Sequence, residues 1–160
     1  MADETRDQTG TAHRGAERKT PRELLGLTEQ RFQAIGQAGV TFYRQGQLEK
    51  ARKIFEGLVR LDPDSGATHA ALGALYTRMR QYDEALKHLN RAIELSPTQV
   101  APYVNRAEIM IRQQRIELAV ADLKQAMALD PAGASPVAGR ARAMALGIQR
   151  ALEAQRAETG

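Results

Sequence analysis

Hydrophobic and polar positions repeat at a fixed interval through the middle of the chain. Between residues 48 and 131 the same succession of apolar, small and polar residues occurs three times, 34 residues apart, and each copy ends in proline. Because proline cannot continue a helix and this period is typical of paired helices, the pattern predicts two helices per copy. These helices are expected at roughly 29–45, 48–61, 66–79, 82–95, 100–113 and 116–129. The repeated landmarks are Ala51, Ala85 and Ala119, and Pro63, Pro97 and Pro131.

Counting each unit so that its proline is the thirty-second residue gives three units, 32–65, 66–99 and 100–133. The middle unit has the clearest pattern, with Leu72-Gly73, Tyr76, Tyr82, Ala85, Leu89, Ala92 and Pro97. These units resemble the tetratricopeptide repeat, a pair of antiparallel helices. The resemblance implies an all-α fold, a right-handed superhelical solenoid of three repeats with a short N-terminal helix and a C-terminal capping helix.

One position departs from the repeat pattern. Arg106 stands where a large apolar residue is usual, whereas Gly39, Gly73 and Ala107 keep the small side chains that let two helices cross closely. We therefore expect altered packing at the start of the third unit.

The two ends of the chain differ from the repeats. Residues 1–19 lack apolar periodicity and are expected to be a disordered tail, with a secretion or docking signal as the alternative interpretation. Thr20, Pro21 and Glu23 form a helix start with a capping box, so the repeat domain is expected over 20–131. Ser135 and Pro136 start a capping helix to about Gln155 within 134–160. Extension into solvent, or pairing with another copy, is the alternative for this helix.

Composition narrows the classes of function. Lys and Arg total 23 against 19 Asp and Glu, a formal charge of +4, and aromatic residues make up only 4%. Without a basic block or stacking rings, nucleic acid is not an expected partner. The chain has no cysteine, no secretory signal pattern and no long apolar run, so we expect a cytoplasmic protein that does not insert into membranes.

The sequence offers no catalytic constellation. His69 and His88 fall on two helices of one repeat and His13 lies in the tail, without a carboxylate at metal-ligand spacing. The glycines near the C-terminus follow no strand and do not form a phosphate-binding loop. We therefore expect neither enzymatic activity nor a bound metal or cofactor.

The repeat resemblance implies a concave groove lined by the first helix of each unit. Alanines would leave room there for the side chains of a bound peptide, with apolar residues flanking them. Arginine recurs at one offset, where it either recognises carboxylates and carbonyls or complements the helix dipole. The expected groove residues are Gln37, Val40, Tyr43, Arg44, Ala70, Ala71, Ala74, Thr77, Arg78, Ala101, Val104, Asn105, Glu108, Ile111 and Arg112, with Gln33, Gly36 and Ala67 at equivalent offsets.

A narrower resemblance concerns the layout of the whole chain. An N-terminal arm, a short helix, three repeats and a closing helix resemble the class II chaperones of type III secretion, which hold translocator proteins. Phrases that resemble theirs are Gly26-Leu27-Thr28, Phe42-Tyr43-Arg44-Gln45-Gly46 and Leu61-Asp62-Pro63. The resemblance implies an extended protein segment in the groove and a homodimer through Leu24, Leu25 and Leu27. A scaffold or adaptor in a multiprotein complex, or an RNA-binding array, are the alternatives.

Another known use of such repeats is not expected. Repeats that clamp the C-terminal carboxylate of heat-shock chaperones carry Lys and Asn at set groove positions. In this chain Gly36, Val40 and Ala71 occupy three of these positions.

Overall fold

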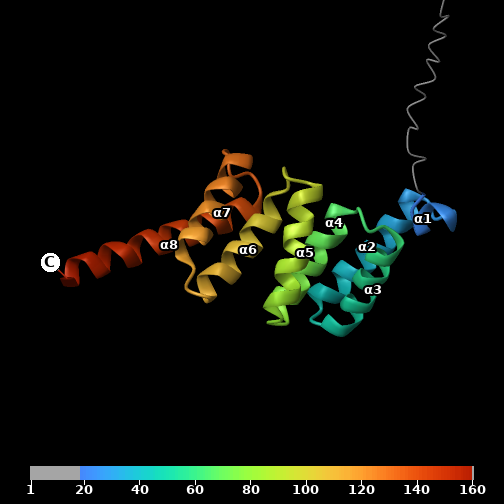
Figure 1. Ribbon diagram of the computed structural model, residues 1–160, viewed down its shortest axis with the longest axis horizontal. Helices are drawn as coiled ribbons and strands as arrows, with labels where there is room; N and C mark the ends of the chain where they lie inside the picture. Colours follow the sequence, from blue (N-terminus) through green and yellow to red (C-terminus); the bar gives the residue numbers. More distant parts are fainter. Residues whose placement is uncertain (1–18, 160) are drawn as a thin grey trace, which may run out of the picture.

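The computed structural model describes residues 19–159, and this part of the chain consists of helices joined by short turns (Figure 1). All of the predicted tail except Lys19 lies outside the described residues. The predicted all-α repeat architecture is confirmed, and the six repeat helices agree with their expected bounds to within one residue. The helices are α1 (Pro21–Leu24), α2 (Glu29–Arg44), α3 (Leu48–Leu61), α4 (Gly66–Arg78), α5 (Tyr82–Leu95), α6 (Val100–Arg112), α7 (Ile116–Leu129) and α8 (Pro136–Thr159).

The turn inside each repeat has one geometry. After the first helix, a single residue adopts a left-handed conformation: Gly46 at φ 75°, Arg80 at φ 60° and Gln114 at φ 58°. The next backbone N–H then donates to a carbonyl five residues back, as Gln81 does to Tyr76 at 2.9 Å. This hydrogen bond closes the end of the helix and turns the chain into the second helix.

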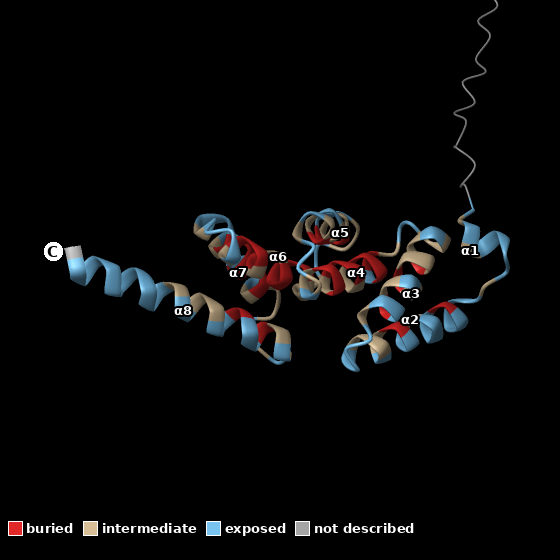
Figure 2. Cartoon of the chain, turned by 90° about the horizontal axis from the view of Figure 1, so that it is seen from below, coloured by how far each residue is buried: buried red, intermediate tan, exposed pale blue. Residues whose placement is uncertain are grey.

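The helices pair within repeats and stack between them. α2 packs against α3, α4 against α5 and α6 against α7, and each second helix also contacts the first helix of the next repeat. α8 contacts both α7 and α6, so it takes the place that the first helix of a fourth repeat would take. Its C-terminal half extends away from the body, and most of this half is exposed (Figure 2).

Small residues allow the close helix contacts. Ala51, Ala85 and Ala119 have no exposed surface, and an added Cβ at Gly73 would lie 2.7 Å from Leu89 Cδ2. Large side chains fill the space on either side and form two clusters, one centred on repeats one and two and one on repeat three and α8. The first includes Phe32, Phe55, Leu58, Leu72, Leu75, Tyr76 and Leu89, and the second Tyr103, Val104, Met110 and Leu123.

The departure at Arg106 is compensated by its neighbours across the repeat. Its Nε and Nη2 donate to the two carboxylate oxygens of Asp122 at 2.8 and 2.7 Å, and its Nη1 donates to Asn90 Oδ1 at 2.7 Å. Asp122 is buried on α7, 34 residues after His88, the equivalent position of the previous repeat. A bidentate ion pair thus replaces an apolar contact where α6 crosses α7.

The short helix α1 is held beside the first repeat by one side chain. Arg22 forms ion pairs with Glu29 and, at 3.4 Å, with Asp62, and its guanidinium lies 5.0 Å from the centre of the Phe32 ring. Leu27 packs against the first core cluster, whereas Leu24 and Leu25 are 71% and 72% exposed. The apolar side of α1 is therefore left open.

Candidate functional site

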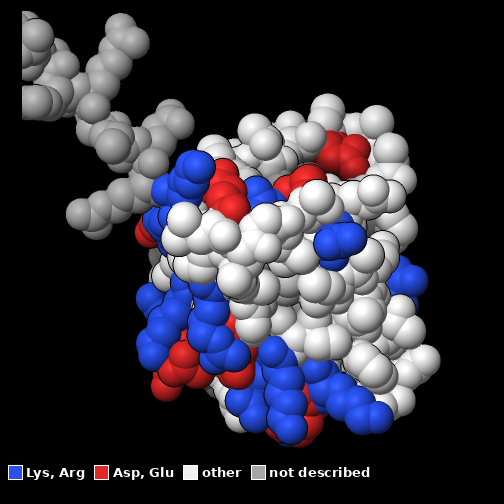
Figure 3. Space-filling model, turned by 90° about the vertical axis from the view of Figure 1, so that its right-hand side faces the viewer, with Lys and Arg blue, Asp and Glu red and all other residues white. Residues whose placement is uncertain are grey.

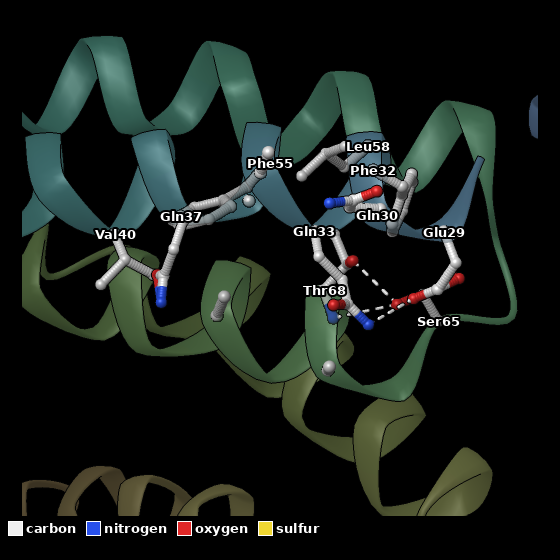
Figure 4. Close-up of a pocket in the computed structure, with 14 residues that line it drawn as sticks. Glu29, Gln30, Phe32, Gln33, Gln37, Val40, Phe55, Leu58, Ser65 and Thr68 are labelled. Carbon is white, nitrogen blue, oxygen red and sulfur yellow. Dashed lines mark hydrogen bonds between the residues drawn. The ribbon is translucent and has the colours of Figure 1, made fainter. Parts of the chain in front are cut away.

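The groove formed by α2, α4 and α6 begins with a cavity between α2 and α4. This cavity has a volume of about 590 Å³. Its floor is apolar, because Phe55 and Leu58 of α3 lie beneath it beside Phe32 and Val40 of α2. Figure 4 shows the α2 and α3 side chains above and α4 below. We call it the apolar cavity; it is also lined by Glu29, Gln30, Gln33, Ala34, Gly36, Gln37, Ser65, Ala67, Thr68 and Ala71.

Polar groups are confined to the rim of the apolar cavity. Gln33 Nε2 donates to Glu29 Oε1 at 2.8 Å on one side, and the Ser65 and Thr68 hydroxyls lie 2.8 Å apart on the other (Figure 4). Gln37 extends from α2 toward α4. An apolar floor with a few amides and hydroxyls at its edge is the arrangement that binds apolar side chains of a peptide and fixes its backbone.

A second cavity continues the groove between α4 and α6. It has a volume of about 320 Å³, and its lining is mostly polar. We call it the arginine cavity, because four arginines and a single glutamate are among the residues that line it. Its lining residues are Tyr43, Ala74, Thr77, Arg78, Arg80, Tyr82, Asn105, Glu108, Arg112 and Arg140.

Some of the predicted groove residues line one of the two cavities, and others line neither. Gln37, Val40 and Ala71 line the apolar cavity, and Tyr43, Ala74, Thr77, Arg78, Asn105, Glu108 and Arg112 line the arginine cavity. Neither cavity is lined by Arg44, Ala70, Ala101, Val104 or Ile111.

The predicted positions in the third repeat are affected by α8. Val104 has no exposed surface and belongs to the second core cluster, and Ile111 packs against the same cluster. Asn105 is 8% exposed and accepts a hydrogen bond from Arg140 of α8. With α8 in this place, Val104 is shielded from any groove ligand, and the open groove is formed mainly by the first two repeats.

Arg44, Arg78 and Arg112 occupy the same offset in the three repeats but make different contacts. Arg78 donates to the Tyr43 carbonyl oxygen at 2.6 Å, and its guanidinium lies 4.9 Å from the centre of the Tyr43 ring, so it joins α4 to the end of α2. Arg112 pairs with Glu108 at 2.9 Å within α6. Arg44 is exposed. Arg78 is therefore a structural link between repeats, while the Arg112 guanidinium stays in the arginine cavity.

The two helical histidines lie together. Their Nδ1 atoms are 2.9 Å apart, and His69 Nε2 lies 3.0 Å from the Pro63 carbonyl oxygen. Burial, and then the neighbouring His69, lower the pKa of His88. His69 Nε2 must donate to the carbonyl, so its Nδ1 accepts from His88 when both rings are neutral. Both rings therefore support packing between α4 and α5, and among the described residues no group of three metal-ligating side chains occurs.

Several lining residues were not among the predicted set. Phe55 and Leu58 come from α3, the second helix of the repeat, and Leu58 lies next to Gly36 of α2, which carries no side chain to cover it. Arg80 comes from the turn after α4, Tyr82 is the first residue of α5, and Arg140 comes from α8. The offsets of first-helix residues could not have identified these, because they lie outside first helices of the three units.

Charged side chains of both signs are mixed over the α1–α3 end of the molecule. Figure 3 shows basic and acidic side chains side by side along one edge and a broad uncharged surface beside them. No helix among the described residues is long and apolar enough to cross a bilayer.

Comparisons with known proteins agree with this geometry. Residues 42–107 and 100–132 match family models of the tetratricopeptide repeat. No curated protein sequence gives a significant match.

Solved structures with the same fold include two secretion chaperones. SycD, the type III secretion translocator chaperone of Yersinia enterocolitica, superposes with a TM-score of 0.71 at 21% identity, covering 80% of this chain and 97% of SycD. PcrH of Pseudomonas aeruginosa, in complex with the chaperone binding region of PopD, gives 0.68 at 26% identity, covering 78% of this chain and 96% of PcrH.

A third match comes from outside secretion. The first repeat domain of Spaghetti, bound to the HSP90 peptide SRMEEVD, gives a TM-score of 0.68 at 20% identity and covers 79% of this chain and 96% of that domain. This likeness concerns the fold alone.

Proposed function

The chain belongs to the tetratricopeptide repeat family, and from this premise we propose that it is a non-catalytic, cytoplasmic peptide-binding protein. Its specific role is that of a type III secretion chaperone, which holds an extended segment of a membrane-active translocator in the groove until export. Keeping such a segment soluble requires a site that covers apolar side chains.

The observation that carries this proposal is the apolar cavity. It is open, it has a floor of Phe55 and Leu58, and the alanines of α4 leave space over it. Phe55 and Leu58 are core residues with 3% and 2% of their surface exposed, so the cavity offers space with an apolar lining rather than a large exposed patch. Concave sites of this kind bind the apolar side chains of peptides. A partner with apolar anchors would cover the cavity.

The secretion-chaperone role draws support from PcrH. PcrH was crystallised with the chaperone binding region of PopD and, separately, of PopB. The match covers 96% of PcrH and 78% of this chain at 26% identity. The fold shared with Spaghetti does not favour an HSP90-type ligand, since Gly36, Val40 and Ala71 lack the amines and amides that would clamp a terminal carboxylate.

A homodimer is part of the proposal. The exposed Leu24 and Leu25 on α1 offer an apolar patch for a second copy, and one SycD structure is described as an alternative dimer. The replacement of both residues by Asp is expected to convert a dimer into a monomer in sedimentation. A wild-type protein that is monomeric at high concentration would remove this part of the proposal.

The proposed function is tested by capture from the native host with two matched variants. Ala34→Arg with Ala67→Arg puts two long side chains into the apolar cavity from exposed positions on α2 and α4. Ala38→Arg with Ala128→Arg makes the same chemical change at exposed positions outside both cavities. Circular dichroism should show equal helix content in all three proteins.

The expected result is a secreted, membrane-inserting protein that is bound by the wild type and the control variant and lost in the cavity variant. A stable multiprotein complex that the cavity variant still binds would instead favour the scaffold interpretation, with another face as the contact.

A further inference from the structure

We propose that the arginine cavity binds a side-chain carboxylate of the peptide whose apolar residue occupies the apolar cavity. This inference rests on the proposed function and adds the chemical class of the ligand. The groove would then select segments in which an acidic residue lies four or five positions from an apolar anchor.

The charge of the cavity is unbalanced. Arg78, Arg80, Arg112 and Arg140 converge on it from α4, the following turn, α6 and α8, and Glu108 is the one carboxylate in the lining. Like charges around one cavity repel one another, and an anion among them lowers that repulsion. The cavity thus has the electrostatics of an anion site.

Some hydrogen-bond donors in the arginine cavity already have a partner within the protein, and others do not. Arg78 is bound to the Tyr43 carbonyl oxygen, and Arg140 to Asn105. Within residues 19–159, the Arg80 guanidinium and the Tyr82 hydroxyl have no hydrogen-bond partner or ion pair. Together with Arg112, which already pairs with Glu108, these groups can donate to both oxygens of an incoming carboxylate.

Arg80 also occupies a conformation that seldom suits arginine. Its φ of 60° lies in the left-handed region, where the equivalent residue of the first repeat is Gly46. A non-glycine residue at such a φ is uncommon. Here that side chain reaches the arginine cavity.

The spacing of the two cavities sets the spacing of the ligand's residues. On α4 the apolar cavity is lined by Ala67 to Ala71 and the arginine cavity by Ala74 to Arg78, which places their centres about 10–13 Å apart along the helix axis. The step from the α2–α4 groove to the α4–α6 groove adds about 9 Å sideways. An extended chain covers the resulting distance of about 13–16 Å in four or five residues.

A carboxylate suits the cavity better than a phosphate. The space is small, and Glu108 already carries one negative charge at its wall, so a dianion would be repelled more strongly than a single carboxylate. The inference assigns this carboxylate to a side chain within the segment, which peptides with amidated C-termini distinguish from a terminal carboxylate.

The test is selection from random peptides of about twelve residues, long enough to span both cavities, displayed on phage against the full-length protein. Selected sequences are resynthesised with amidated C-termini and measured by fluorescence anisotropy. The variant Arg80→Gln with Arg112→Gln removes the two guanidinium groups that do not join separate helices and keeps the structural links through Arg78 and Arg140. Lys53→Gln with Arg60→Gln changes the net charge equally at exposed positions on α3, outside both cavities.

The expected result is a set of peptides with Asp or Glu four or five positions from a large apolar residue. Their affinity should fall about tenfold to hundredfold in the Arg80/Arg112 variant and stay unchanged in the Lys53/Arg60 variant. Replacing the acidic residue by Asn should lower wild-type affinity similarly, with no further loss in the Arg80/Arg112 variant. Arg80→Glu with Arg112→Glu should then prefer a Lys at that position.

The outcomes separate the two proposals. Peptides that lose affinity for the cavity variant Ala34→Arg/Ala67→Arg but show no acidic preference would overturn the carboxylate inference and leave the groove as the binding site. Binding that needs a free C-terminal carboxylate would overturn it as well. A selection that yields only peptides indifferent to the Ala34/Ala67 change would overturn the proposed function and this inference together.

Discussion

Single residues decide how closely the helices of a repeat approach. At Gly73 an added Cβ would lie 2.7 Å from both Cγ and Cδ2 of Leu89 and 3.3 Å from the Leu89 backbone nitrogen, and Leu89 has no exposed surface. Because the backbone of α5 must move to accept a methyl group, the crossing of α4 and α5 depends on this glycine.

We therefore expect Gly73→Ala to lower the free energy of unfolding by about 1–3 kcal/mol. Gly57→Ala is the matched control, since nothing lies within 4 Å of an added Cβ there and alanine favours a helix. The control should raise stability by about 0.5–1 kcal/mol. Urea denaturation measures both, and a Gly73→Ala protein as stable as the control would contradict the packing account.

The left-handed turn residues give a second prediction at this scale. Arg80→Gly and Gln114→Gly both relieve a left-handed conformation, so each should raise the free energy of unfolding by about 0.5–1 kcal/mol. Only Arg80→Gly should weaken binding of the selected acidic peptides, because Gln114 lines neither cavity. Equal affinities of the two variants would show that the Arg80 side chain does not contact the ligand. Gln113→Gly, at a right-handed position, should lower stability instead.

At the scale of helices, the third repeat shows how one crossing can be rebuilt. Arg106 of α6 and Asp122 of α7 occupy the offsets of Leu72 and His88 in the second repeat, so a polar pair stands where an apolar side chain packs elsewhere. The hydrogen bonds that Arg106 donates to Asp122 are the main reason that the pKa of Arg106 is raised. The two residues work as a unit.

This pairing predicts strong coupling between the two positions. Arg106→Leu alone leaves the buried Asp122 unpaired and should cost about 1–3 kcal/mol. Adding Asp122→Ala should recover much of that loss, because an apolar contact then replaces the ion pair. Thermal and urea unfolding of the wild type, both single variants and the double variant form the cycle, and additive losses would contradict the coupling.

The helices themselves were largely predictable from the sequence, and the contacts between residues on different helices were not. Period, prolines and the Thr20 capping box give the helix bounds because they act within a few residues along the chain. Arg106 was expected to disturb packing, yet its compensation by Asp122 sixteen residues later is visible only in three dimensions. The contribution of Arg140 to the arginine cavity likewise depends on where α8 folds back.

For the whole molecule, α8 closes the solenoid with its first half only. Ala138 and Ala141 are fully buried and the helix covers Val104, whereas residues 149–158 are exposed. Exposed side chains contribute little burial, so the two halves should differ sharply in their importance for folding.

Truncation tests this division. A chain ending at Ile148 should unfold with nearly the wild-type midpoint, whereas a chain ending at Ser135 uncovers Val104 and its neighbours and should lose several kcal/mol or aggregate. Denaturation midpoints and light scattering compare the three proteins. A stable, monomeric chain ending at Ser135 would mean that the repeats need no cap.

The most direct test of the central claim is site-specific photo-crosslinking of the bound partner. A benzophenone amino acid is placed at Ala67, exposed in the apolar cavity, or at Lys87, exposed on α5 outside both cavities. If the groove holds the partner, illumination should yield a crosslinked product from position 67 and none from position 87. A product from position 87 alone would contradict the account and place the partner on the outer face of the solenoid.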